Sequence, residues 1–386
     1  MKSLGSILIT LISLTAVVTK GQESGSGISD TLMFRGQLSA WAHGNPSNEL
    51  PVYTGGRYIP QINYEINFPQ NRMIDFEFSA NTYGNIGTDF ADSLNTSGKI
   101  KPYRAWIRYS TRQLEIRAGL QKINFGSAAI IRPLMWFDQV DPRDPLQLTD
   151  GVWGLLIRYY FLNNANIWLW SLYSHGDIKG WELVPSNKYT PEFGGRIQVP
   201  VPRGELGMSY HHRIADTRDL DSLVPVYAHL PENRFGLDIR FDYVIGCWLE
   251  ASYNRKSEDL GFFTNQEIIN LGIDYTFGIG NGLYGIFEQL IYSSDQDAFT
   301  FKNTTTFSLL SLSYPVGLFD KLSAIIYYNW TDNSLYNFIN WQRDFNRISL
   351  YVMGYWNPEN YHIPLQGSGE NLYAGKGIML MIVFNH

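Results

Sequence analysis

The chain has almost no cysteine. Cys247 is the only one among 386 residues, which excludes a disulfide framework within the chain and a thiolate metal cluster. Charge is scarce as well, because Asp, Glu, Lys and Arg make up 17% of the residues, against roughly 25% in ordinary soluble domains. The formal net charge is -6 at pH 7, so no basic excess indicates a nucleic-acid partner.

Long apolar runs are missing too, except near the N-terminus. Lys2 precedes an apolar stretch from Leu4 to Val18, which small residues and the polar string QESGSG follow. This pattern is typical of a secretory signal peptide. We therefore predict that residues 1–21 are cleaved and that residues 22–386 form a single domain, with an uncleaved anchor as the alternative. No later window offers the ~18 uncharged apolar residues of a membrane-spanning helix.

Aromatic residues are abundant at 15%, and many of them alternate with polar residues. In MIDFEFSA, Ile74, Phe76 and Phe78 share one face, while Asp75 and Glu77 share the other. The strings RYIPQINYEIN, YRAWIRYS, LEIRAGLQ and RFGLDIRFDY repeat the pattern. A side-chain period of two predicts strands with one apolar and one polar face.

The connections between these strands alternate in length. Short turns such as PQNR, STRQ, LNNA, PVPRGE and VIGC separate long segments, among them 82–102 and 125–151. This rhythm is typical of outer-membrane barrels, which have long extracellular loops and short periplasmic turns. We predict an all-β fold, a closed antiparallel transmembrane barrel with both termini periplasmic. The barrel should have about 18 strands, with about 16 as the alternative. The expected location is the outer membrane of a Gram-negative bacterium.

One largely apolar stretch, residues 155–174, has the length of a transmembrane helix but contains Arg158 and an Asn-rich centre. We interpret it as two strands joined by a tight turn at Asn163 and Asn164, residues that tolerate a positive φ. Arg158 then points away from the face that carries Leu155. The second strand, residues 167–170, is apolar on both faces, and the sequence does not decide which of its residues face lipid.

Charged residues at the polar strand positions are expected to line the barrel lumen. Arg104, Arg108 and Arg117 would form a positive strip, with Asp75 and Glu77 on the preceding strand. Such a strip is either a transverse field that sorts solutes by charge or a salt-bridged lining of the wall. The full set of expected lumen residues is Asp75, Glu77, Arg104, Arg108, Glu115, Arg117, Arg158, Arg196, Asp238 and Arg240.

The third long connection, residues 125–151, is unusually apolar for a loop and also carries clustered charges. Apolar residues in a connecting segment indicate that it packs against another surface. We predict that it folds into the barrel as a constriction, with an extracellular cap as the alternative. Three aspartates there are weak candidates for a divalent cation, because Arg143 lies among them, so no metal site is predicted. The constriction residues are expected to be Arg132, Asp138, Asp141, Arg143 and Asp144.

Enzymatic chemistry has little support in the sequence. Ser209 and His211 fall on one face of a predicted strand, the least that a nucleophile and base would need. No phosphate-cradling glycine motif and no metal-spaced histidine cluster is present. We predict that the chain is not an enzyme and uses no cofactor.

The segment IRAGLQKINFGSA and the loop and strand after it resemble outer-membrane porins of Bacteroidota type, with the alginate-export and phosphate-selective porin groups as relatives. Arg117, Gly119 and Gln121, followed by Gly126, carry this resemblance, which is specific over residues 103–161. It implies a channel for the passive passage of small hydrophilic solutes. The alternatives are a dedicated exporter or importer of an anionic oligosaccharide or anion, and a closed barrel that acts as an anchor or scaffold. The expected partners are the outer-membrane bilayer, the solutes and the barrel-assembly machinery, while homo-oligomerisation is left open.

Overall fold

The computed structural model describes residues 18–20, 28–89, 94–138, 140–174, 176–220, 224–359 and 373–386. The predicted signal peptide lies outside these residues apart from its last part, residues 18–20. Among the described residues, no helix is long and apolar enough to cross a membrane. The strands are β1 (Val18–Lys20), β2 (Ser29–Gly44), β3 (Val52–Phe68), β4 (Arg72–Thr88), β5 (Leu94–Ser110), β6 (Leu114–Gln121), β7 (Val152–Tyr160), β8 (Asn166–Tyr173), β9 (Pro191–Val201), β10 (Gly204–Ala215), β11 (Leu230–Asp242), β12 (Gly246–Lys256), β13 (Asn265–Phe277), β14 (Leu283–Asp295), β15 (Thr304–Pro315), β16 (Asp320–Asn329), β17 (Ser334–Asp344), β18 (Ile348–Trp356) and β19 (Lys376–Asn385), and η1 (Gly261–Phe263) is a short 3-10 helix.

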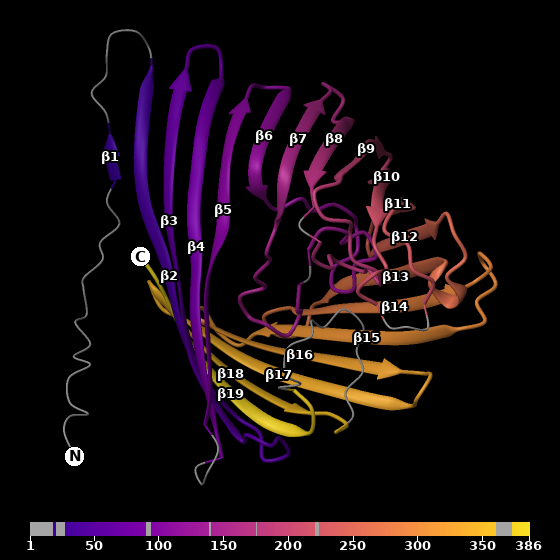
Figure 1. Ribbon diagram of the computed structural model, residues 1–386. Coiled ribbons are helices and arrows are strands. Elements are labelled where there is room, and N and C mark those ends of the chain that lie inside the picture. Colours follow the sequence, from indigo (N-terminus) through magenta and orange to yellow (C-terminus); the bar gives the residue numbers. More distant parts are fainter. Residues whose placement is uncertain are drawn as a thin grey trace.

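The strands β2 to β19 form one closed antiparallel barrel of 18 strands, which confirms the predicted fold. Each strand pairs with the next, and β19 closes the ring by pairing with β2 from Ile378 opposite Gly44 to Asn385 opposite Gln37. Figure 1 shows the yellow C-terminal strands returning beside β2. β1 pairs with β2 beyond the end of β19, with Val18 opposite Met33. Closure satisfies the backbone donors and acceptors that an open sheet edge would expose to lipid.

The second connection is shorter than the sequence indicates. Most of residues 82–102, expected to be a long loop, continue β4 to Thr88 and begin β5 at Leu94, and these two residues are paired. The expectation of a loop was wrong, although the segment contains glycines, which are common in turns. Gly84 and Gly98 instead lie opposite each other in the ladder, where backbone pairing needs no side chain.

The alternating residues divide as predicted between the outer surface and the lumen. Phe76 and Phe78 are exposed on the outer face of β4, whereas Ser79 is buried on the inner face. In the former helix-like stretch, Leu155 is exposed and Leu156 is buried. Strand β8, undecided from sequence, exposes Leu169 and turns Trp168 and Trp170 inward, because the two tryptophans pack against the third long connection.

Candidate functional site in the barrel lumen

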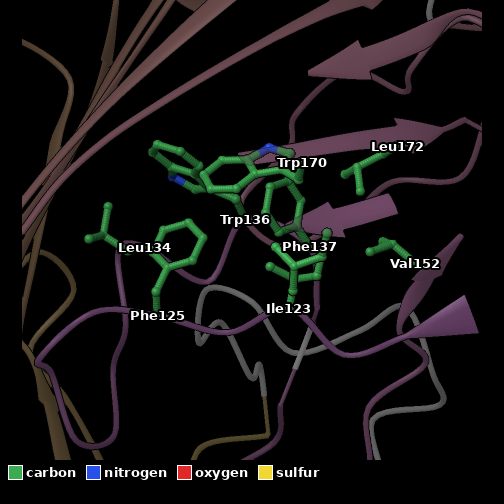
Figure 2. Packing of buried hydrophobic residues seen from close by; sticks show 9 residues of the cluster. Ile123, Phe125, Leu134, Trp136, Phe137, Val152, Trp170 and Leu172 are labelled. Carbon is green, nitrogen blue, oxygen red and sulfur yellow. The ribbon is translucent and has the colours of Figure 1, made fainter. Parts of the chain in front are cut away.

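The connection between β6 and β7, residues 122–151, lies inside the barrel and is called loop 3 below. Its apolar residues pack against inward-facing side chains of β7 and β8, as Figure 2 shows. The rings of Phe125 and Trp170 stack with centroids 5.5 Å apart, and Trp136 meets Phe125 edge-on at the same separation. The buried cluster comprises Ile123, Phe125, Leu134, Trp136, Phe137, Val152, Leu156, Trp170 and Leu172.

Two carboxylates on the barrel wall bind the backbone of loop 3. Glu288 of β14 accepts hydrogen bonds from the backbone N–H groups of Ala129, Ile130 and Ile131 at 2.9, 3.0 and 2.7 Å. Glu250 of β12 accepts from the N–H groups of Ala128 at 2.8 Å and Leu134 at 2.6 Å. A carboxylate that accepts several backbone N–H bonds is a strong anchor, because each such bond is charge-assisted.

Further contacts extend the attachment over the wall that β11 to β14 form. Asn270 of β13 donates to the carbonyl oxygen of Ile131 at 2.6 Å. The Trp136 indole N–H donates to Ser252 Oγ of β12 at 2.9 Å. Loop 3 begins and ends at β6 and β7 but is bound by β12, β13 and β14, so it spans the lumen from one wall toward another. No signal in the sequence indicated the role of Glu288, because its partners in loop 3 are distant along the chain.

Two cavities lie on opposite faces of loop 3. The outer cavity, about 620 Å³, lies at the long-connection ends of β5 to β8 and is lined on the loop side by Asp138, Asp141 and Asp144. The inner cavity, about 440 Å³, lies against the wall from β14 to β18 and is lined on the loop side by Arg132, Arg143 and Asp144. Asp144 lines both. The five residues expected at a constriction therefore divide between two adjoining spaces.

Ion pairs remove some of these charges. Arg143 binds Asp141 through two bonds of 2.7 Å, and its guanidinium lies 4.2 Å from the ring centroid of Tyr373. At the rim of the outer cavity, Lys101 pairs with Asp150.

Other charges keep no ion-pair partner among the described residues. In the outer cavity these are Asp138, Asp144, Asp177 and Lys99, and in the inner cavity Lys122, Arg132, Lys321 and the shared Asp144. After pairing, the outer cavity is mainly acidic and the inner cavity mainly basic.

Burial changes the protonation of the loop residues. Desolvation raises the pKa of Asp138 to about 6, against the opposing effect of the Gly151 N–H and of the positive charges of Arg104 and Lys122. Its Oδ1 accepts from Gly151 N at 2.7 Å, while its Oδ2 has no hydrogen-bond partner among the described residues. Burial also raises the pKa of Asp144 and lowers the pKa of Lys122. Each shift disfavours the charged form, as expected for groups removed from water.

The charged strip on the wall is an ion-pair ladder. Arg108 of β5 binds Asp75 of β4 through bonds of 2.9 and 2.8 Å. Glu115 of β6 lies 3.0 Å from Arg117 and 3.5 Å from Arg158 of β7. This geometry corresponds to the salt-bridged alternative.

Arg104 is not part of the ladder, contrary to the expected strip. Its guanidinium donates to the hydroxyl of Thr149 at 2.7 Å and to the Thr149 carbonyl oxygen at 3.1 Å, both in loop 3. Glu77 remains on the inner face of β4, where it lies opposite Trp106 of β5. The expected strip of arginines is therefore broken at Arg104. Strand alternation predicts the face on which Arg104 lies, but not that loop 3 provides its hydrogen-bond acceptors.

The remaining expected lumen residues are also paired. Arg196 of β9 and Asp238 of β11 form a buried ion pair at 2.9 Å, and Ser127 of loop 3 donates to the same Asp238. Arg240 pairs with Asp242 and with Asp274, at 2.8 and 2.9 Å.

His211 and Ser209 do not form a nucleophile–base pair. The His211 imidazole lies between the Trp170 N–H at 3.1 Å and a Glu192 carboxylate oxygen at 3.2 Å. Ser209 Oγ accepts from Arg196 at 3.1 Å. Both side chains are buried, and the His211 ring lies 5.0 Å from the ring of Phe137 in loop 3. Within the described residues, no group of three His, Cys, Asp or Glu side chains is arranged to hold a metal ion.

Cysteine labelling should separate the two faces of the wall. With the native Cys247 replaced by serine, Arg108→Cys lies toward the lumen and Phe78→Cys on the outer surface. We expect a water-soluble thiol reagent to modify the first variant in lipid vesicles, and a membrane-confined reagent to modify the second. Labelling of Phe78→Cys by the water-soluble reagent alone would contradict this assignment of faces.

The fold and the lumen define a closed transmembrane β-barrel whose interior contains a long inserted loop. No protein-family model matches the sequence, and no curated protein matches it. Solved structures match the fold. Wzi of Escherichia coli, described as an outer-membrane, carbohydrate-binding β-barrel involved in group 1 capsule assembly, aligns with a TM-score of 0.54 and 10% identity over 91% of this chain and 84% of its own.

Two further solved structures are similar in fold. OccK5 (OpdH) of Pseudomonas aeruginosa gives a TM-score of 0.55 at 10% identity, covering 92% of this chain and 97% of its own. OccAB4 of Acinetobacter baumannii gives a TM-score of 0.54 at 10% identity, covering 92% and 98%. At such low identity these likenesses show a shared β-barrel fold.

Proposed function

We propose that the chain is an outer-membrane channel for the passive passage of small hydrophilic solutes, with loop 3 as its constriction. The observation that carries this proposal is the pair of cavities that adjoin at Asp144, one on each face of a loop bound to the wall by Glu250 and Glu288. Rigid attachment keeps a constriction at constant size, whereas a loop without anchors would fluctuate across the pore. Solutes would move down their gradient with no covalent step and no cofactor.

The setting of the barrel belongs to the same proposal. The exposed aromatic and aliphatic side chains on the outer surface suit a lipid bilayer, and the similar Wzi barrel is described as an outer-membrane protein. We place the chain in the outer membrane of a Gram-negative bacterium, reached through a cleaved signal peptide and the barrel-assembly machinery. We also propose that it is a porin of Bacteroidota type, similar to the alginate-export and phosphate-selective groups.

Single-channel recording in planar bilayers tests the channel. The refolded chain without residues 1–21 should give a steady open level in symmetric salt. In a salt gradient we expect a small reversal potential, because the unpaired acidic residues of the outer cavity oppose the unpaired basic residues of the inner one. If a barrel that is shown to be folded gives no conductance, the channel is contradicted. That result would favour a scaffold that co-purifies with a partner.

A dedicated passage for an anionic oligosaccharide is the second candidate, and the inward-facing tryptophans favour it. Guanidiniums lie over these rings, Arg158 at 3.9 Å from the centroid of Trp168 and Arg117 at 4.8 Å from that of Trp106. Aromatic rings suit the apolar faces of sugars, and the two guanidiniums, which also pair with Glu115, have further N–H groups for the carboxylates of acidic sugars. Strong block of the current by one anionic oligosaccharide, with weak conductance in its absence, would support this candidate over the open channel.

A further inference from the structure

Unpaired charges of opposite sign line the two cavities beside loop 3. Toward the outer cavity lies Asp138, whose Oδ2 has no hydrogen-bond partner among the described residues although the side chain is 5% exposed. Toward the inner cavity lies Lys122, which forms no ion pair with any described residue. The two residues lie at the neck of the loop, because Lys122 follows β6 directly and Asp138 is bound to Gly151 just before β7.

The surroundings repeat this division on each side. Asp177 adds negative charge to the outer cavity, which also contains Lys99, while Arg132 and Lys321 add positive charge to the inner one; Asp144 lines both. Arg132 also keeps a buried Nε without a hydrogen-bond partner among the described residues. A solute with one charge would be attracted on one side of the loop and repelled on the other. A solute with both charges can meet an opposite charge on each side.

We propose that this channel recognises zwitterionic solutes, such as free amino acids or short peptides, with the ammonium group toward Asp138 and the carboxylate toward Lys122. Apolar lining on both sides, including Phe137 in the outer cavity and Ile130 in the inner one, suits the short carbon skeleton between the two charges. This inference rests on the proposed channel and names its solute class.

Four matched dipeptides test the charge requirement. Gly-Gly carries both charges, N-acetyl-Gly-Gly only the negative one, Gly-Gly amide only the positive one, and N-acetyl-Gly-Gly amide neither. From the concentration dependence of single-channel block, we expect Gly-Gly to bind about tenfold or more tightly than each of the others, since it alone makes charge-assisted bonds on both sides. Equal block by all four, or block by one singly charged dipeptide as strong as that by Gly-Gly, would overturn the inference.

Calorimetric titration of the folded barrel with the same dipeptides separates this inference from the proposed function. Conductance without discrimination among the dipeptides would overturn the solute class and leave the channel standing. If a folded barrel without conductance still binds the dipeptides with different affinities, the channel proposal is overturned and the binding site is supported.

Variants assign each charge to its residue. In Asp138→Asn, Gly-Gly should bind no better than N-acetyl-Gly-Gly, and in Lys122→Gln it should bind no better than Gly-Gly amide. The matched controls are Asp297→Asn and Lys302→Gln, an exposed pair at 3.8 Å on the connection between β14 and β15. Loss of discrimination in the controls, or its persistence in both cavity variants, would overturn the assignment.

The pH dependence gives an independent check. Burial raises the pKa of Asp138 to about 6, and the groups that act on its carboxyl are Arg104 of β5, Lys122, Asp150 and the Gly151 N–H. The carboxyl is ionised above that pH and neutral below it. The advantage of Gly-Gly over N-acetyl-Gly-Gly should thus be present at pH 7 and lost toward pH 5, a range in which the dipeptide itself stays zwitterionic because its termini titrate near roughly 3.5 and 8. An advantage that is unchanged at pH 5 would contradict the role of Asp138.

Discussion

Replacing residues 131–142 by a short glycine–serine linker should raise the single-channel conductance roughly twofold or more, because conductance follows the free cross-section of the narrowest part. The replaced segment contains Leu134, Trp136 and Phe137, which fill the space between loop 3 and the walls. The strand pairing of the barrel does not depend on it, since each of β2 to β19 pairs with its neighbours through the backbone. The refolded barrel is therefore expected to persist with a wider lumen.

A matched replacement of residues 297–302, in the connection between β14 and β15, is the control. Its Asp297 and Lys302 are 72% and 70% exposed, so this segment does not obstruct the lumen. Conductance should stay close to that of the parent chain. Heat-modifiable gel migration, which distinguishes folded from unfolded barrels, verifies folding of both variants. An unchanged conductance in the folded loop 3 variant would show that the loop does not limit the pore.

Substitution of Glu288 by alanine is expected to release loop 3 from the wall. The carboxylate accepts three backbone N–H bonds, each worth about 1.5–3 kcal/mol because the acceptor is charged. Their loss should raise the released population of the loop at least about a hundredfold. Cleavage by trypsin after Arg143, whose side chain is buried in the parent protein, measures that population when release and rebinding are fast. Single-channel recordings should show new fluctuations between conductance levels.

Two further substitutions sharpen this test. In Glu288→Gln, the amide NH2 replaces a carboxylate oxygen that had accepted a hydrogen bond from a backbone N–H of loop 3. Two donors then face each other without an acceptor, so release of the loop should remain substantial. Glu65→Ala is the control, because Glu65 is an inward-facing carboxylate of β3 for which Asn67 is the donor at 2.6 Å. If Glu65→Ala exposes loop 3 to trypsin as much as Glu288→Ala does, the anchoring role of Glu288 is wrong.

The sequence was most informative where local geometry decides. Ile74, Phe76 and Phe78 alternate with Asp75 and Glu77, and a strand places successive side chains on opposite faces regardless of distant contacts. The turn at Asn163 and Asn164 was likewise readable, and Asn164 has a positive φ of 67°. The sequence failed for residues 82–102, since glycine is compatible with both a loop and a paired strand.

The candidate site was predictable in its residues and not in their partners. Composition alone marked loop 3 as a segment that packs against a surface, because solvated loops do not carry so many apolar side chains. That Arg104 turns to Thr149, or that Arg143 binds Asp141, depends on which chain segments meet in space. Glu250 and Glu288 lie on the lumen side of β12 and β14, but nothing in the sequence indicated that loop 3 would occupy their oxygens.

By itself, the sequence determined the barrel, its number of strands to a close approximation and the faces of most strands. These properties follow from the period of two and from the lengths of the connections, which act over a few residues at a time. Only the tertiary structure decided where loop 3 binds, which charges are neutralised and which remain on each side of Asp144. The physical reason is that a charge on the lumen wall acquires its role from partners more than a hundred residues away, as Glu250 does from Ala128 and Glu288 from Ile131.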